Sequence, residues 1–215
     1  MIEKVVNGIK YLLNEETLTA EIVENEGNGS KINIPEIVVF NEVSYRVTCI
    51  KEKGFSGYPS LTSIIIPDSV TEIGARAFAN CHKLTDITIP DSVTSIGERA
   101  FLWCFSLNTV TIPNSVTTVG KRTFSGCESL TAITIPNSVE SIGEEAFLDC
   151  ESLEEIVIGN GVKSIGAEAF CRCEMLTNIR FQGTIAQWGR IELGDGWNDE
   201  VCTTVVSCTD GDVEI

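Results

Sequence analysis

The sequence predicts a mostly β solenoid, a stack of parallel strands joined by short turns with a cap at each end. The first supporting observation is a period of 23 residues that several columns of residues share. The second is an L-x-x-I-x-I pattern in each unit, which is typical of one strand in a parallel sheet. The third is that the period fades toward both ends, where terminal repeats must close the stack. The proline column is Pro67, Pro90, Pro113 and Pro136, and the glycine column is Gly74, Gly97, Gly120, Gly143 and Gly166.

Each unit can be divided into local elements. Residues 84–89 are expected to form a long strand, and Pro90 follows at a strand end, where its missing N–H is tolerated. Asp91 closes an Asx-type turn, Val-x-x-Ile-Gly forms a shorter strand, and Ala-Phe-x-x-Cys is expected to make a single helical or 3₁₀ turn. Since coils stack about 4.8 Å apart, equivalent side chains should form continuous internal ladders. The predicted ladders are Phe78, Phe101, Phe124, Phe147 and Phe170, and Cys81, Cys104, Cys127, Cys150 and Cys173.

The period sets the expected organisation of the chain as a single folding unit. Six repeats are predicted over residues 47–181, with degraded motifs in the first and last. Residues 1–46 lack the period and alternate apolar segments (10–13, 18–23 and 31–34) with turn residues, which predicts a strand meander as the N-terminal cap. Residues 182–215 are expected to form the C-terminal cap.

The unit I-P-[DN]-S-V-T-x-I-G-x-x-[AT]-F-x-x-C-x-x-L resembles the BspA-like class of leucine-rich repeats, and the resemblance covers essentially the whole chain. It implies a leucine-rich-repeat solenoid in a secreted or surface-exposed bacterial protein, in a class whose members include adhesins for host proteins. The first eight residues have no apolar leader segment, so a cytoplasmic location is the alternative expectation. The shared residues are structural and do not identify a ligand.

Composition excludes several function classes. With 31 acidic and 15 basic residues the net charge is −16, so no nucleic acid is expected as a partner. No segment approaches the roughly 20 apolar residues of a membrane span, so no membrane insertion is expected. His82 is the only histidine and no phosphate-binding glycine loop is present, so the sequence predicts neither an enzyme nor a cofactor.

The cysteine ladder is expected to consist of free, buried thiols that act as small apolar side chains. Identical side chains on parallel strands point the same way, which disfavours disulfides within the ladder and a tetrahedral zinc site. Cys202 and Cys208 are the better candidates for a disulfide. The C-terminal acids Asp195, Asp199, Glu200, Asp210 and Asp212 lack the spacing of a calcium loop, so no metal is expected there.

Outward positions of the long strands are candidate partner-binding residues, because this face of a solenoid is broad and rigid. The alternative is that threonine is simply a good residue for a half-exposed strand. The candidates in two neighbouring columns are Thr88, Thr111, Thr134 and Arg180, and Asp86, Thr109 and Glu155.

A second candidate surface breaks the repeat pattern. One coil has Leu102, Trp103 and Phe105 around its ladder cysteine, where other coils have mostly polar or small residues. An exposed aromatic cluster is typical of a protein contact, so self-association through Trp103 and Phe105 is one expectation. The alternative is that the rings fold back over neighbouring turns.

The function predicted from these features is a non-catalytic binding or adhesion module with a protein or glycan partner. A structural or self-assembling surface protein is the alternative. Charge is unevenly distributed: residues 123–181 carry −7 and residues 182–215 carry −6, whereas residues 47–122 carry +1. Electrostatic binding of basic partners is therefore expected at the C-terminal end.

Overall fold

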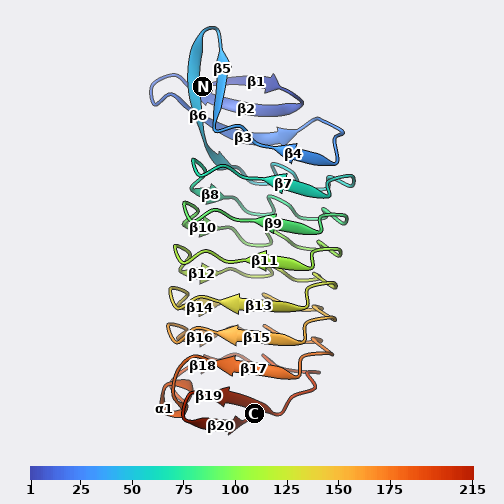
Figure 1. The fold of residues 1–215 in the computed structure, drawn as a ribbon, viewed down its shortest axis with the longest axis vertical. Coiled ribbons are helices and arrows are strands. Elements are labelled where there is room, and N and C mark those ends of the chain that lie inside the picture. The colour runs from blue at the N-terminus through green and yellow to red at the C-terminus, as the bar shows by residue number, and fades with distance from the viewer.

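The computed structural model describes residues 1–215 and confirms the predicted parallel-stacked solenoid (Figure 1). Each coil contributes one long and one short strand, and equivalent residues 23 apart pair in parallel, as in Ser63 with Asp86. The long strands, in order along the stack, are β4 (Lys31–Asn33), β7 (Ser63–Ile65), β9 (Asp86–Thr88), β11 (Thr109–Thr111), β13 (Ala132–Ile135), β15 (Glu155–Ile158), β17 (Asn178–Phe181) and β19 (Val205–Cys208).

The short strands form a second column behind the first. It begins with the end of β6 (Val43–Ile50), whose Ile50 pairs with Ile73. The column continues with β8 (Glu72–Ile73), β10 (Ser95–Ile96), β12 (Thr118–Val119), β14 (Ser141–Ile142), β16 (Ser164–Ile165) and β18 (Glu192–Leu193).

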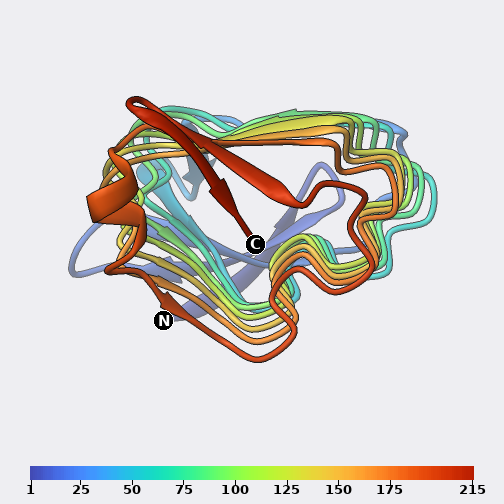
Figure 2. The ribbon, with the colours of Figure 1, turned by 90° about the horizontal axis from the view of Figure 1, so that it is seen from below.

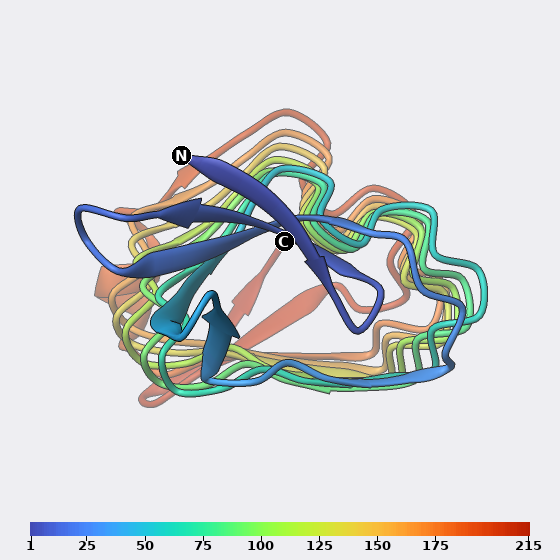
Figure 3. The ribbon, with the colours of Figure 1, turned by 90° about the horizontal axis from the view of Figure 1, so that it is seen from above.

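The strand columns extend beyond residues 47–181 into both predicted caps. At the N-terminal end β1 (Ile2–Val6), β2 (Ile9–Asn14) and β3 (Thr19–Asn25) form an antiparallel meander, and β5 (Ile37–Phe40) pairs with β6 in a hairpin (Figure 3). The expected third strand of the meander, β4, instead pairs in parallel with β7 and starts the long-strand column. At the other end β20 (Gly211–Glu214) folds back antiparallel on β19 (Figure 2).

The expected helical or 3₁₀ turn of the repeat does not form. Hydrogen bonds such as Ala77 N to Gly74 O and Cys81 N to Phe78 O close successive tight turns instead. Arg76 and Asn80 have φ of 55° and 63°, and such left-handed residues interrupt any helical run. The one helix is α1 (Ile185–Trp188) in the C-terminal cap, and no helix has the length and apolar character needed to cross a membrane.

The core is built on the two predicted ladders. Neighbouring phenylalanine rings from Phe55 to Phe170 are stacked with centroids 5.3–5.5 Å apart. Trp197, in the C-terminal cap, ends the ladder by packing edge-on against Phe170 at 6.1 Å. Each ladder cysteine is fully buried, and its thiol donates to a phenylalanine carbonyl 26 residues earlier, as in Cys104 Sγ to Phe78 O at 3.2 Å.

The expected Cys202–Cys208 disulfide is absent, and all nine cysteines are free thiols. The Cys202 thiol points toward the preceding coil, where it donates to the Glu174 carbonyl at 2.7 Å. Cys208 lies at the end of β19 and pairs with Gly211 across the terminal hairpin. The two thiols are therefore held by different partners.

One coil boundary departs from the regular stack. Strands β10 and β12 are not paired, and neither are β11 and β13, so both ladders are interrupted between the same two coils. The turns between those coils remain bonded, for example by Phe101 N to Thr123 O at 2.9 Å, and the Phe101 and Phe124 rings remain 5.3 Å apart. The boundary is therefore a wedge, closed at the phenylalanine ladder and open at the strands.

Candidate functional site

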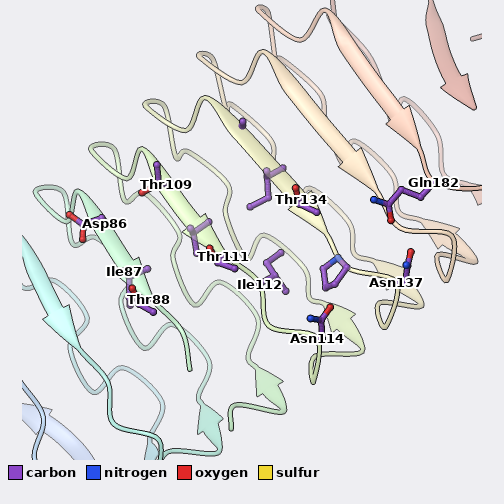
Figure 4. Close-up of a pocket in the computed structure, with 14 residues that line it drawn as sticks. Asp86, Ile87, Thr88, Thr109, Thr111, Ile112, Asn114, Thr134, Asn137 and Gln182 are labelled. Atoms are coloured by element: carbon purple, nitrogen blue, oxygen red, sulfur yellow. The ribbon is translucent and has the colours of Figure 1, made fainter. Parts of the chain in front are cut away.

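The strand face carries a shallow polar groove over β9, β11 and β13, with a volume of about 640 Å³ (Figure 4). It lies across the open side of the wedge, where β11 and β13 are unpaired. A second hollow of about 620 Å³ adjoins it and shares Asp86, Thr88 and Thr111, extending the concave surface to β7. The residues that give the groove its polar lining are Asp86, Thr88, Thr109, Thr111, Thr134, Asn114, Asn137 and Gln182.

Local sequence changes coincide with the wedge that underlies the groove. Thr123 stands in a buried column that is alanine in the neighbouring coils, at Ala100 and Ala146, and its hydroxyl donates to Gly120 O at 2.9 Å. A methyl group added at Gly143 would lie 2.7 Å from the preceding backbone. One added at Gly120 would lie 3.6 Å from the nearest backbone atom, Glu98 Cα. The coils are thus measurably further apart at Gly120.

The open side of the wedge also lowers the burial of β11. Val110 in β11 is only partly buried, whereas the equivalent isoleucines Ile87 and Ile133 are buried. The amides of Thr117, Gly120 and Thr131 do not donate to the preceding coil, although the equivalent amides of the next coil do. In the groove itself, the unpaired edges of β11 and β13 place backbone groups beside the hydroxyl and amide side chains.

The structure brings five of the predicted strand-face residues into the groove and leaves two outside it. Asp86, Thr88, Thr109, Thr111 and Thr134 line it from three adjacent strands. Arg180 and Glu155 lie further along the same face on β17 and β15, where their side chains form an ion pair at 3.4 Å. They extend the face toward its C-terminal end.

Sequence reasoning missed the groove residues outside the strands. Asn114 and Asn137 occupy the turn position after the proline, which Asp91 holds in an earlier coil and which the sequence predicts only as a turn, and Gln182 follows β17. The signal was present, because a turn residue next to a strand end lies at the border of the same face. Asn137 Oδ1 also accepts from Asn160 N at 2.9 Å, which fixes its side chain.

The groove is suited to hydrogen bonding. Threonine hydroxyls donate and accept, and asparagine and glutamine side chains do both. Asp86 is the only ionisable side chain in the lining, and its carboxylate accepts from the Thr85 hydroxyl at 3.0 Å. The lining therefore offers hydrogen-bond donors and acceptors and a single carboxylate.

The predicted aromatic cluster lies on a different side of the coils. Trp103 is 48 % exposed, while Leu102 and Phe105 are half-buried. Phe105 stacks on His82 with ring centroids 4.6 Å apart. The rings thus partly fold back over the neighbouring turn, and Trp103 remains the accessible member.

The C-terminal acids show no metal-binding arrangement, and no group of three or more His, Cys, Asp or Glu side chains is placed to hold an ion. Asp210 has a structural contact, because its carboxylate accepts from the Ile185 N–H at the start of α1 at 2.8 Å.

Residues 26–154 match the family model described as BspA type leucine rich repeat region, in six copies. No curated protein sequence matches the chain. The fold is similar to that of a leucine rich cell surface protein from Faecalibacterium prausnitzii, with a TM-score of 0.78 and 30 % identity over all of this chain and 58 % of that one. The chain thus spans less than two thirds of that relative.

Two other solved structures have a similar fold. The leucine rich repeat protein of T. pallidum has a TM-score of 0.77 and 29 % identity, over 90 % of this chain and 86 % of that one. A leucine-rich repeat protein from Eubacterium ventriosum has a TM-score of 0.75 and 26 % identity, over 98 % of this chain and 54 % of that one. With its 23-residue coils, its ladders and a family match over more than half its length, the chain belongs to the BspA-type leucine-rich repeat family.

Proposed function

We propose that the protein is a non-catalytic binding module that acts at a cell surface and presents the strand face, centred on the groove, to a macromolecular partner. The observation that carries the proposal is the interruption of the β11–β13 ladder beneath the groove, which adds free backbone groups to a polar lining. The surface location is supported by the F. prausnitzii relative, which is described as a cell surface protein.

The lining favours an extended polar partner. The groove has hydroxyl, amide and carboxylate groups but no aromatic side chain, so its contacts are hydrogen bonds rather than a large apolar anchor. A peptide segment or a glycan has the matching donors and acceptors along its length. Adhesion to a host protein or glycan is the role that fits this surface and the family resemblance.

The test is a binding screen against an array of host extracellular-matrix proteins and glycans. Thr111→Arg places a long cation in the middle of the groove and is expected to weaken wild-type binding on the order of tenfold or more. Thr118→Arg, on the exposed short-strand face, is the matched control and should bind as the wild type does. Binding to no probe, or equal binding by both variants, would contradict a role for the groove.

Self-assembly is the second candidate function, and one observation favours it. Trp103 is a large, exposed aromatic residue on a side of the solenoid that the groove does not use. Exposed tryptophans are enriched at protein contacts.

A further inference from the structure

The side of the solenoid that carries Trp103 is formed by the seven turns that join each short strand to the next long strand, and we call it the turn edge. In Figure 2 it is the stepped outline at the right, opposite α1. The turns are residues 51–60, 74–83, 97–106, 120–129, 143–152, 166–175 and 194–203. Their charges are separated along the stack. The first four turns hold seven bases and three acids, and the last three hold nine acids and one base.

One column shows this separation residue by residue. The column is the second position after the repeat glycine, together with the equivalent position in the first turn. Its residues have φ between 55° and 62° in six successive turns. This fixed backbone conformation repeats the same side-chain direction from turn to turn. The column reads Lys53, Arg76, Arg99, Arg122, Glu145 and Glu168.

On the turn edge, close ion pairs form across the sign change and at one further place, where Arg172 Nη1 lies 2.8 Å from Asp149 Oδ1. Arg122 donates to both carboxylate oxygens of Glu145 at 2.6 and 2.7 Å, and Lys121 donates to Glu144 at 2.7 Å. Away from that boundary the nearest carboxylate to Arg76 is at 3.8 Å, too far for a hydrogen bond. Glu168, at the other end of the column, is exposed and forms no ion pair. Arg76, which has only this loose ion pair, and Glu168, which has none, therefore stand at equal distances from the fourth turn.

The exposed tryptophan lies close to the middle of the same edge. Trp103 belongs to the third of the seven turns, and its indole extends over Gly126 of the fourth. A Cβ at Gly126 would lie 2.5 Å from Trp103 Cδ1, so the glycine is required for this position. Asn80, Asp149 and Arg172 occupy the equivalent position in neighbouring turns.

We propose that the turn edge is an interface between two copies of this chain that lie antiparallel, related by a two-fold axis across the turn of residues 120–129. Such an axis places the second turn of one copy against the sixth of the other, and the third against the fifth. Arg76 then faces Glu168 of the second copy, and Trp103 faces Asp149. Because the interface is isologous, each of these contacts occurs twice.

Charge complementarity selects a second copy as the occupant. A purely basic partner would match only the last three turns, and an acidic one only the first four. The antiparallel copy matches both halves at once, and a parallel copy would place like charges together. The opposing Asp149 and Arg172 form an ion pair at 2.8 Å, and the Trp103 indole N–H and ring face can pack on its carboxylate and its guanidinium, respectively.

The interface is expected to be weak and sensitive to salt. Six coil spacings of about 4.8 Å make the edge roughly 29 Å long, which places it at the small end of specific protein interfaces. Exposed charges are screened beyond a Debye length of about 10 Å at 0.1 M salt. The strand face stays free in this dimer, so the proposal does not depend on the groove.

The test is sedimentation equilibrium of the full chain, in reducing buffer, at about 50 mM and about 500 mM salt. We expect a monomer–dimer equilibrium at low salt with a dissociation constant that rises at least about tenfold at high salt. Trp103→Ser should weaken the dimer at both salt concentrations. A wild type that stays monomeric at millimolar concentration, or a dimer that salt does not affect, would overturn the proposal.

Charge exchange tests the contacts themselves. Arg76→Glu and Glu168→Arg should each abolish dimerisation, and an equimolar mixture of the two variants should restore it. Lys163→Glu and Glu140→Lys, on the short-strand side, are the matched controls and should dimerise as the wild type does. No loss in the single variants, or no rescue in the mixture, contradicts the Arg76–Glu168 contact.

Orientation is tested by cross-linking in a Cys202→Ser background, which removes the exposed thiol. A Lys83→Cys chain mixed with a Met175→Cys chain should form a mixed disulfide dimer, because the second and sixth turns face each other. A preference of each variant for its own copy would show a parallel pair and overturn the antiparallel arrangement.

Discussion

At the residue scale, the buried thiols of the cysteine ladder make the stability of the fold depend on pH. Burial raises the pKa of the Cys81 thiol to about 12, and it also raises the pKa values of Cys104, Cys127 and Cys150. In the unfolded chain a thiol ionises near pH 8.5. A raised folded-state pKa means that the contribution to stability is complete below about pH 8.5 and is lost as pH rises toward the folded-state value.

We therefore expect the free energy of unfolding to fall above about pH 8.5, with each of these four thiols adding up to about 1.4 kcal/mol per pH unit. Cys127→Ala removes one such thiol, so its stability should fall less steeply with pH, although a cavity lowers it throughout. Urea unfolding between about pH 8 and pH 10, in reducing buffer, measures both slopes. Cys202→Ala, at an exposed position, is the control and should keep the wild-type slope. Equal slopes for wild type and Cys127→Ala would contradict this explanation.

At the element scale, the wedge between residues 90–112 and 113–135 is the main irregularity of the stack. It leaves the amides of Thr117, Gly120 and Thr131 without the inter-coil bond that Glu140, Gly143 and Glu154 make one coil later. Amide exchange requires loss of a hydrogen bond, and these three groups have none to lose.

Hydrogen exchange followed by NMR should show Thr117, Gly120 and Thr131 exchanging on the order of tenfold or more faster than Glu140, Gly143 and Glu154. Thr123→Ala restores the alanine of the neighbouring coils and is expected to slow exchange at the three sites by allowing the coils to close. Similar protection in both sets of amides would show that the ladder is continuous in solution.

The element scale also separates what sequence could and could not predict. Coils of constant length were predictable, because equivalent residues recur every 23 positions. Strands β4, β18 and β19 could not be predicted from the 23-residue period, because they pair with residues 32, 28 and 27 positions away. The wedge could not be predicted from the sequence for another reason. It coincides with conservative changes, Val110 for isoleucine and Thr123 for alanine, whose effect depends on packing between coils.

The candidate site was also predictable only in part. Alternation along the strands placed Thr88, Thr111 and Thr134 on one face, which a period of two dictates. That these residues line a groove depends on the wedge, which no local pattern encodes. Asn114 and Gln182 join the site only through the three-dimensional path of the turns.

At the scale of the whole molecule, the wedge divides the solenoid into two stacks, residues 1–112 and 113–215. In a solenoid, stability is approximately a sum of coil terms and nearest-neighbour interface terms. The wedge boundary lacks the strand pairing that the other coil boundaries have, although the Phe101–Phe124 contact and the bonded turns still connect the stacks. It is therefore the boundary at which cooperativity should fail first.

Phe147→Ala tests this by weakening the second stack alone. Removing a fully buried ring costs about 3–5 kcal/mol, and the loss falls on coils beyond the wedge. We expect urea unfolding of this variant to separate into two steps, with residues 113–215 unfolding first and amides of residues 1–112 still protected from exchange. Phe78→Ala, which weakens the first stack by the same chemistry, is the matched variant and should reverse the order. A single transition with the wild-type m-value in both variants would contradict the division, because it would require the interface across the wedge to couple the coils as strongly as the paired ones do.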